Sequence, residues 1–396
     1  MINMKKLLII GASILQLPAI KKAKELGYYV IVADYDPYAI GVNYADEYYN
    51  VSTIDEEGIT LLAEMVRPDG IMTLATDLPM RSLAAATNKL GLFGISYETA
   101  VKATDKGEMI KAFEAAGVEH PWYYIIKDKN ELISVLPNLS YPCVIKPTDN
   151  AGNRGVSFAI NEAELLSQYD YSHKNSHSGD VIVEEYMEGK EVSVEVIVYH
   201  GDVHILAVTD KLTQGKPYFV EIGHSEQSQL GDENVDRIKD LASRAVKAIG
   251  IDNGPAHVEI MYTKDGPKMV ELGARMGGGC ITTHLVPLAT GIDMIKSVMD
   301  MAMGGEPDVT PKFNRGSALR HIVGLEGIIE SVDGLDEAKA YPGVTEVTML
   351  KGIGDTVGYF RNGSDRIGYV IAQGNDAADA VKICEDAMKF IQIKVK

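Results

Sequence analysis

The sequence has no long apolar run. No stretch approaches the roughly 18 apolar residues that a membrane-spanning helix needs, so we expect neither a spanning segment nor a membrane partner. The apolar run near the N-terminus, Leu7–Ile10, is too short for the core of a secretory signal peptide, and it ends at a glycine. We therefore expect a cytoplasmic protein.

Cysteine and positive charge are also scarce. The three cysteines (Cys143, Cys280 and Cys384) lack metal-like spacing, and an odd, sparse count fits a reducing compartment rather than a disulfide framework. Lys and Arg number 38 against 56 Asp and Glu, a net charge of −18 that argues against a nucleic-acid partner. At about 100–200 residues per domain, the 396 residues predict two to four domains.

Two familiar nucleotide-binding motifs are absent. The turn Gly11–Ser13 offers one glycine where a dinucleotide fingerprint needs three. The loop from Asp149 to Gly155 carries Gly152, but it lacks the spacing of a P-loop. A nicotinamide oxidoreductase therefore stays a rival class that rests on the N-terminal turn alone.

Strand and helix signals alternate up to about residue 100. The apolar runs Leu7–Ile10 and Val30–Ala33 are continuous, as in parallel strands buried on both faces, and the alternation continues through residues 69–77 and 94–98. This pattern predicts an open parallel α/β domain over residues 1–100. Short strands and a last helix, near residues 376–393, predict a small β-rich lobe from 311 to 396.

Residues 257–279 hold two acids that a hairpin would bring face to face. They read as strand, turn at 264–266 and strand. With Asp265 at the centre, Glu259 lies opposite Glu271 on one face. Facing like charges are destabilising unless a cation lies between them, and Mg²⁺ often uses one or two carboxylates plus phosphates. The alternative is a solvated face with the acids splayed apart.

Two lysines are candidate phosphate ligands. Lys146 shares an apolar strand face with Val144, and a loop with Gly152 and Arg154 follows it; glycine-bearing loops form anion-binding concavities. Lys106 lies in the first turn of a predicted helix, where the helix dipole disfavours a cation. Alternatively, the Lys146 ammonium reaches water or pairs with a buried anion. The alternative for Lys106 is a solvated side chain.

The acidic strand exit at residues 181–191 is a candidate base and ribose site. A strand end followed by Gly189 leaves backbone groups free to contact an adenine edge, and Glu191 can accept from two ribose hydroxyls. The alternative is an ordinary acidic strand exit.

In this order, the segments resemble an ATP-grasp ligase, in the group of glycinamide ribonucleotide synthetase, the carboxyaminoimidazole enzymes, biotin carboxylase and the L-amino-acid ligases. The resemblance covers essentially the whole chain. It implies a mixed α/β and α+β body in three parts: a pre-domain (1–100), an ATP-grasp domain (101–310) with a lid subdomain at about 120–187, and a C-terminal β-rich lobe (311–396).

The resemblance also implies roles for individual residues, with ATP and Mg²⁺ or Mn²⁺ as cofactors. Lys106 and Lys146 would contact phosphates, and Arg154 and Gly155 would belong to the lid. Glu184 would belong to the ATP site, the backbone of Glu185, Tyr186 and Met187 would hold adenine, and Glu191 would hold ribose. Glu259 and Glu271 would bind the metal. Lys146 and Arg275 are the candidate catalytic residues, Arg275 because its fork suits phosphate or carboxylate.

Two departures bear on the substrate. The family commonly shows Glu-x-Asn-x-Arg, whereas residues 271–275 have Gly273 at the asparagine position, a form that resembles the amino-acid ligase branch. Ile14 and Gln16 stand where purine-pathway relatives tend to carry a polar residue and glycine, which weakens a purine-ribonucleotide assignment.

The leading hypothesis is an ATP-dependent carboxylate–amine (or thiol) ligase that forms an acyl phosphate and releases ADP and phosphate. The alternatives are a purine-pathway-like ribonucleotide ligase or carboxylase, the oxidoreductase, and a non-enzymatic nucleotide sensor. Candidate substrate contacts are Asp77, His224, His284 and Arg320, although each histidine also reads as a structural residue. The expected partners are small carboxylates and amines, and a second copy of the chain is a further candidate.

Overall fold

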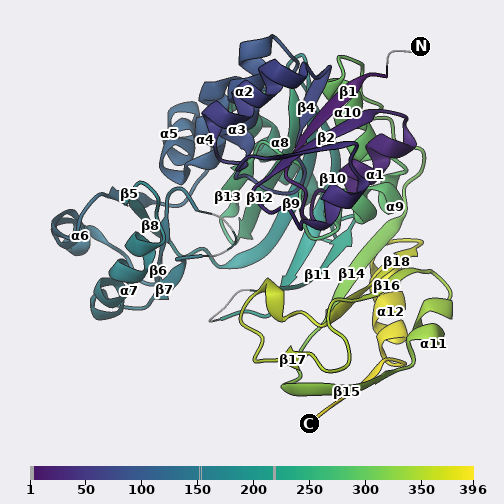
Figure 1. The fold of residues 1–396 in the computed structure, drawn as a ribbon. Helices are drawn as coiled ribbons and strands as arrows, with labels where there is room; N and C mark the ends of the chain where they lie inside the picture. Colours follow the sequence, from purple (N-terminus) through teal and green to yellow (C-terminus); the bar gives the residue numbers. More distant parts are fainter. Residues whose placement is uncertain (1–3, 151, 153, 217–219) are drawn as a thin grey trace.

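The computed structural model describes residues 4–150, 152, 154–216 and 220–396. The N-terminal domain is a four-stranded parallel sheet in the order β3-β2-β1-β4, covered by helices (Figure 1). Its elements are β1 (Lys6–Ile10), α1 (Leu17–Glu25), β2 (Tyr29–Asp34), β3 (Glu47–Asn50), α2 (Glu56–Val66), β4 (Gly70–Met72) and α3 (Met80–Leu90). The predicted parallel α/β fold is confirmed. The strand expected within residues 94–98 is wrong, because Ser96 accepts the Thr99 N–H and caps α4 (Tyr97–Thr104).

A four-stranded antiparallel sheet, in the order β5-β8-β6-β7, forms a separate body at the left of Figure 1. Its elements are β5 (Tyr123–Ile126), α6 (Lys129–Val135), β6 (Cys143–Pro147), β7 (Ser157–Ala159), α7 (Glu162–Lys174) and β8 (Val181–Glu185). It has a small core of its own that includes Leu132, Ile145 and Val183. We call this body the lid. Helix α5 (Lys106–Ala116) precedes it, and the Asp105 side chain caps its start by accepting the Glu108 N–H.

Eight antiparallel strands form the central sheet, in the order β13-β12-β9-β10-β11-β14-β18-β16. The strands are β9 (Gly189–Tyr199), β10 (Asp202–Thr213), β11 (Glu221–Glu226), β12 (Gly254–Thr263), β13 (Gly266–Gly273), β14 (Gly316–Ile322), β16 (Val344–Met349) and β18 (Gly368–Gly374). The helices near it are α8 (Asp232–Ile249), α9 (Val286–Thr290) and α10 (Met294–Ala302). The boundary expected near residue 310 falls in the coil after α10, but β11 pairs with β14, so the sheet continues across it.

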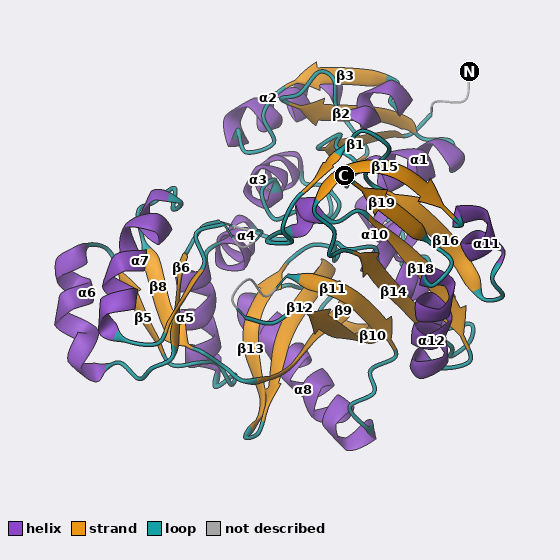
Figure 2. Ribbon diagram, turned by 90° about the horizontal axis from the view of Figure 1, so that it is seen from below, coloured by secondary structure: helices purple, strands orange, loops and turns teal. Residues whose placement is uncertain are grey.

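The rest of the C-terminal lobe packs on the far end of this sheet (Figure 2). Its elements are β15 (Gly327–Asp333), α11 (Leu335–Ala340), β17 (Thr356–Val357), α12 (Ala377–Met388) and β19 (Gln392–Val395). The last helix, expected to reach about residue 393, ends at Met388, and β19 then pairs with β15. Among the described residues, no helix has both the length and the apolar character needed to cross a membrane.

Candidate active site

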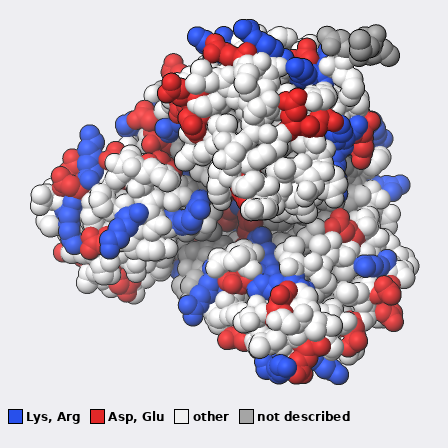
Figure 3. All heavy atoms as spheres, in the orientation of Figure 1, with Lys and Arg blue, Asp and Glu red and all other residues white. Residues whose placement is uncertain are grey.

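The two faces of the central sheet differ in chemistry. On β9, Val192 and Val194 pack into the core beneath α8. Side chains alternate along a strand, so Glu191, Ser193 and Glu195 point to the opposite face. Figure 3 shows the molecular surface hollowed between the N-terminal domain, the lid and the C-terminal lobe, with acidic and basic atoms visible inside the hollow.

Glu259 and Glu271 lie directly opposite each other, which confirms the predicted pairing. The predicted turn at residues 264–266, centred on Asp265, is wrong in its extent. Thr263 pairs with Gly266, so the turn consists of Lys264 and Asp265 alone. The register then shifts next to Glu259, and this bulge brings the two acids opposite each other.

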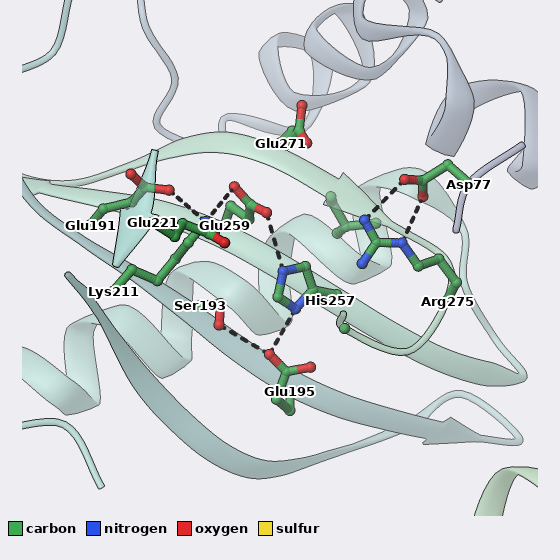
Figure 4. A network of polar contacts seen from close by, with 12 residues as sticks. Asp77, Glu191, Ser193, Glu195, Lys211, Glu221, His257, Glu259, Glu271 and Arg275 are labelled. Carbon is green, nitrogen blue, oxygen red and sulfur yellow. Dashed lines mark hydrogen bonds and ion pairs between the residues drawn. The ribbon is translucent and has the colours of Figure 1, made fainter. Parts of the chain in front are cut away.

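Glu259 is held on both of its carboxylate oxygens. Oε1 lies 3.1 Å from His257 Nε2, and Oε2 lies 3.0 Å from Lys211 Nζ (Figure 4). Burial alone would raise the pKa of Glu259, but Lys211 and His257 outweigh it and hold the pKa well below its usual value. Burial opposes the charge on His257 too, yet Glu195 and Glu259 raise its pKa to about 9.

Lys211 is the centre of an acidic cluster that sequence reasoning missed. Its side chain is 3% exposed, and Nζ lies 2.6 Å from Glu191, 3.0 Å from Glu221 and 3.0 Å from Glu259. These four residues come from four adjacent strands, β12, β9, β10 and β11. The pKa of Lys211 is raised well above its usual value, because the three carboxylates outweigh its burial.

The two predicted phosphate lysines lie against acids. Lys146 Nζ is 2.7 Å from Glu184 Oε2, and both side chains are 9% exposed, so this is a buried ion pair. Lys106 Nζ is 3.3 Å from Glu271 Oε2 and donates to the Asn150 carbonyl at 2.8 Å. Lys106 therefore links the start of α5, the candidate metal hairpin and the loop after β6.

The predicted adenine segment leaves the lid sheet and enters the central sheet. Glu185 Oε2 lies 2.8 Å from Lys268 Nζ on β13, and Lys216 Nζ lies 4.5 Å from the centre of the Tyr186 ring. Met187 follows in the coil before β9. The segment thus joins the two sheets, with Glu191 two residues into β9.

The predicted glycine loop is closely packed at its end. Gly155 is buried with φ +81°, and a Cβ there would lie 2.6 Å from the Pro147 ring, so no other residue fits. Arg154 is exposed. Residues 151 and 153 of this loop lie outside the described residues.

Arg275 and Asp77 form a two-point ion pair. Nε donates to Oδ1 at 3.0 Å and Nη2 to Oδ2 at 2.9 Å, while Nη1 donates to the Met276 carbonyl at 3.3 Å. The Arg275 side chain is 12% exposed. The candidate catalytic arginine and a candidate substrate contact thus meet, joining the N-terminal domain to the end of β13.

The other candidate substrate contacts lie further along the sheet. The His224 side chain is fully buried, its ring nitrogens have no hydrogen-bond partner among the described residues, and burial lowers its pKa to about 4. His284 Nε2 lies 3.1 Å from Glu346 Oε2.

Arg320 lies beside α12, with Nε 3.6 Å from Glu385, and is not brought to the acidic cluster. Arg366 reaches it instead, with Nη2 3.4 Å from Glu221.

The described residues contain no group of three or more His, Cys, Asp or Glu side chains placed to hold a metal by themselves. What converges is a facing pair of carboxylates, lysines on either side, and a lid sheet above them. Facing carboxylates with lysines beside them are typical of a nucleotide-dependent enzyme.

Family comparison agrees with this class. Residues 139–284 match the ATP-grasp domain, and residues 321–396 match L-amino acid ligase C-terminal domain 2. The chain therefore contains an ATP-grasp domain followed by a C-terminal domain of the L-amino acid ligase type, as the sequence resemblance implied.

Individual relatives point the same way. Alanine–anticapsin ligase of Bacillus subtilis (strain 168) is 25% identical over 319 residues, which span 74% of this chain and 66% of the relative. This relative is thus aligned over about two thirds of its length. Phosphoribosylglycinamide synthetase from Anaerococcus prevotii is 27% identical with a TM-score of 0.81 and full coverage of both chains. L-amino acid ligase from Bacillus licheniformis is 23% identical with a TM-score of 0.85 over 99% of both chains, a likeness of fold.

Proposed function

We propose that this protein is an ATP-dependent ligase that joins a carboxylate to an amine and releases ADP and phosphate. The observation that carries the proposal is the facing of Glu259 and Glu271 beside Lys106, within an ATP-grasp domain. Phosphoryl transfer needs positioning and charge neutralisation more than covalent chemistry by the protein, and this site supplies both.

The donor set fits Mg²⁺. Glu259 and Glu271 present hard carboxylate oxygens on one face of the hairpin, the ligands Mg²⁺ prefers, and leave the remaining positions to phosphate and water. Each carboxylate already lies against a lysine, Lys211 or Lys106, so the pair is built around positive charge. A bound metal ion would neutralise charge on the phosphate oxygens.

The chain's own residues then have separate tasks. Lys106 and Lys146 bind ATP phosphates, Glu191 accepts from ribose hydroxyls, and residues 185–187 hold adenine where the two sheets join. The substrate carboxylate oxygen attacks the γ-phosphorus as the bond to ADP breaks. The amine nitrogen then attacks the acyl carbon, phosphate leaves with the bonding electrons, and the nitrogen loses a proton. Arg275 stabilises charge on the transferring oxygens.

Amino acids are the proposed substrate class. The C-terminal domain match, the alanine–anticapsin ligase relative and Gly273 support it. Asp77 and His284 are the proposed substrate contacts; the fully buried His224 is not. A ribonucleotide substrate is the second candidate, because the phosphoribosylglycinamide synthetase structure matches the full chain.

The test is ADP release with ATP and Mg²⁺ against pairs of amino acids, with ribosylamine phosphates and bicarbonate as controls. We expect release above background for at least one amino-acid pair, with ¹⁸O passing from the substrate carboxylate into phosphate. ATP binding without release on any substrate would favour a nucleotide sensor. Thermal stabilisation by NADH and not by ATP–Mg²⁺ would favour an oxidoreductase.

A further inference from the structure

A buried chain of polar side chains runs from the candidate metal site into the sheet. Glu259 Oε1 lies 3.1 Å from His257 Nε2, and His257 Nδ1 lies 2.7 Å from Glu195 Oε1. The same Glu195 oxygen accepts from the Ser193 hydroxyl at 3.0 Å. Figure 4 shows these groups in one row, on the face that carries Glu259.

The buried position of the Glu195 carboxylate is energetically unfavourable. It is 0% exposed, and its second oxygen has no hydrogen-bond partner among the described residues. Burying a carboxylate is strongly unfavourable unless it is paired and hydrogen-bonded. Its only ion-pair partner among those residues is the His257 ring, so the stabilisation that this carboxylate receives comes from that ring.

Gly277 packs against both members of the His257–Glu195 pair. A Cβ on this residue would lie 2.6 Å from His257 Nδ1 and 2.9 Å from Glu195 Oε2. The backbone that follows Arg275 therefore lies directly on the imidazole and the carboxylate. With a carboxylate beneath it and this backbone over it, the ring is held in one orientation.

The fixed ring in turn fixes Glu259. Lys211 contacts one carboxylate oxygen and His257 the other, so the carboxylate plane cannot rotate without breaking a contact. Partners of this kind orient metal ligands and tune metal affinity. We infer that His257 and Glu195 are positioning residues that aim Glu259 at the metal shared with Glu271, an inference that rests on the proposed function.

The test compares two buried acids. Glu195→Gln keeps the shape and removes the charge beneath His257. Asp34→Asn is the control, because Asp34 is also buried and accepts the Ala12 N–H at 2.7 Å within the N-terminal domain, away from Glu259. Thermal unfolding of both variants establishes that they fold. Mn²⁺ binding in the presence of ADP is measured by electron paramagnetic resonance, and the Mg²⁺ dependence of kcat is measured beside it.

We expect Glu195→Gln to raise the Mn²⁺ dissociation constant about 10–100-fold, and Asp34→Asn to leave it unchanged. Equal Mn²⁺ affinity for Glu195→Gln and the wild type would overturn the positioning role. No Mn²⁺–ADP binding by the wild type would instead overturn the proposed function. If Glu195→Gln does not fold, the double variant Glu195→Leu/His257→Phe replaces the buried pair by apolar groups, and the same loss of affinity is expected.

Discussion

Asp77 occupies the space that a side chain at position 273 would need. Its Oδ1 atom lies 2.5 Å from the point where a Cβ on Gly273 would stand, and the Arg275 Nε atom lies 3.0 Å from that point. The glycine at this position and the Asp77–Arg275 ion pair therefore depend on each other. Asp77, a residue of the N-terminal domain, thus fills the space that the asparagine of Glu-x-Asn-x-Arg would need.

Replacing Gly273 by asparagine should separate Asp77 from Arg275. Forcing a side chain into a packed site typically costs about 1–3 kcal/mol, which urea unfolding would measure. Adding Asp77→Ala should recover part of this loss, because it empties the contested space. Gly358→Asn is the control, since a Cβ at Gly358 meets nothing within 4 Å. Wild-type stability of Gly273→Asn would contradict the steric account.

The sequence predicted the hairpin pairing because strand alternation and a short turn limit the possible registers. Glu259 and Glu271 do face each other, but through a two-residue turn and a bulge rather than a turn centred on Asp265. Nothing in the local sequence distinguishes a turn centred on Asp265 from a two-residue turn followed by a bulge. A bulge is fixed by contacts of the whole sheet, which periodicity does not encode.

Lys211, His257 and Glu195 could not be assigned from the sequence, because each gains its role from strands far away in the chain. Glu195 contacts His257 across 62 residues, and Lys211 contacts Glu259 across 48. One signal was present: Glu191, Ser193 and Glu195 alternate with buried valines, which marks a polar face on an otherwise apolar strand. That signal identifies the face but not its partners.

Arg275→Lys should keep ATP binding and lose turnover. The lysine retains the charge but not the fork that grips Asp77 at two points. Loss of one transition-state contact costs on the order of 3–4 kcal/mol, a hundredfold to a thousandfold in rate. ADP release and calorimetric ATP binding would separate the two effects. Arg244→Lys, in an exposed pair with Glu119, is the control. Unchanged turnover of Arg275→Lys would exclude the catalytic role.

Lys146→Ala should weaken ATP binding and destabilise the lid. It leaves Glu184 buried without its cation, and breaking a buried pair typically costs about 3–5 kcal/mol. The double variant Lys146→Met/Glu184→Leu should regain stability without regaining ATP affinity. Unfolding and ATP titration of both variants would show this difference. A wild-type dissociation constant in either variant would return Lys146 to a structural role.

The Glu346–His284 pair should make stability depend on pH. Contacts with Cys280 and Glu346 raise the pKa of His284 to about 10. The contribution of protonated His284 to stability is therefore full below roughly pH 6.5 and is lost as pH rises toward 10. His284 lowers the pKa of Glu346 to about 2. The contribution of ionised Glu346 to stability is therefore full above roughly pH 4.3 and is lost as pH falls toward 2.

Glu346→Gln should therefore destabilise the protein most near pH 5–6 and less at pH 9. Both side chains are about a third exposed, so the difference should be about 1 kcal/mol after solvent screening. Urea unfolding at the two pH values would measure it, with Glu330→Gln, at an exposed pair with Lys396, as the control. An equal cost at both values would contradict the assignment.

Lys211→Met should destabilise the protein, and a divalent metal should offset part of the loss. The variant leaves Glu191, Glu221 and Glu259 together without the ammonium that lies within 3.0 Å of each. An uncompensated buried charge typically costs about 3–5 kcal/mol. Mg²⁺ binds carboxylate oxygens, so it should raise the melting temperature of this variant more than that of the wild type. Lys190→Met, at an exposed position on the same strand as Glu191, is the control and should show neither effect. If Lys211→Met unfolds at the wild-type urea concentration, Lys211 is not the counter-charge that holds the acidic cluster together.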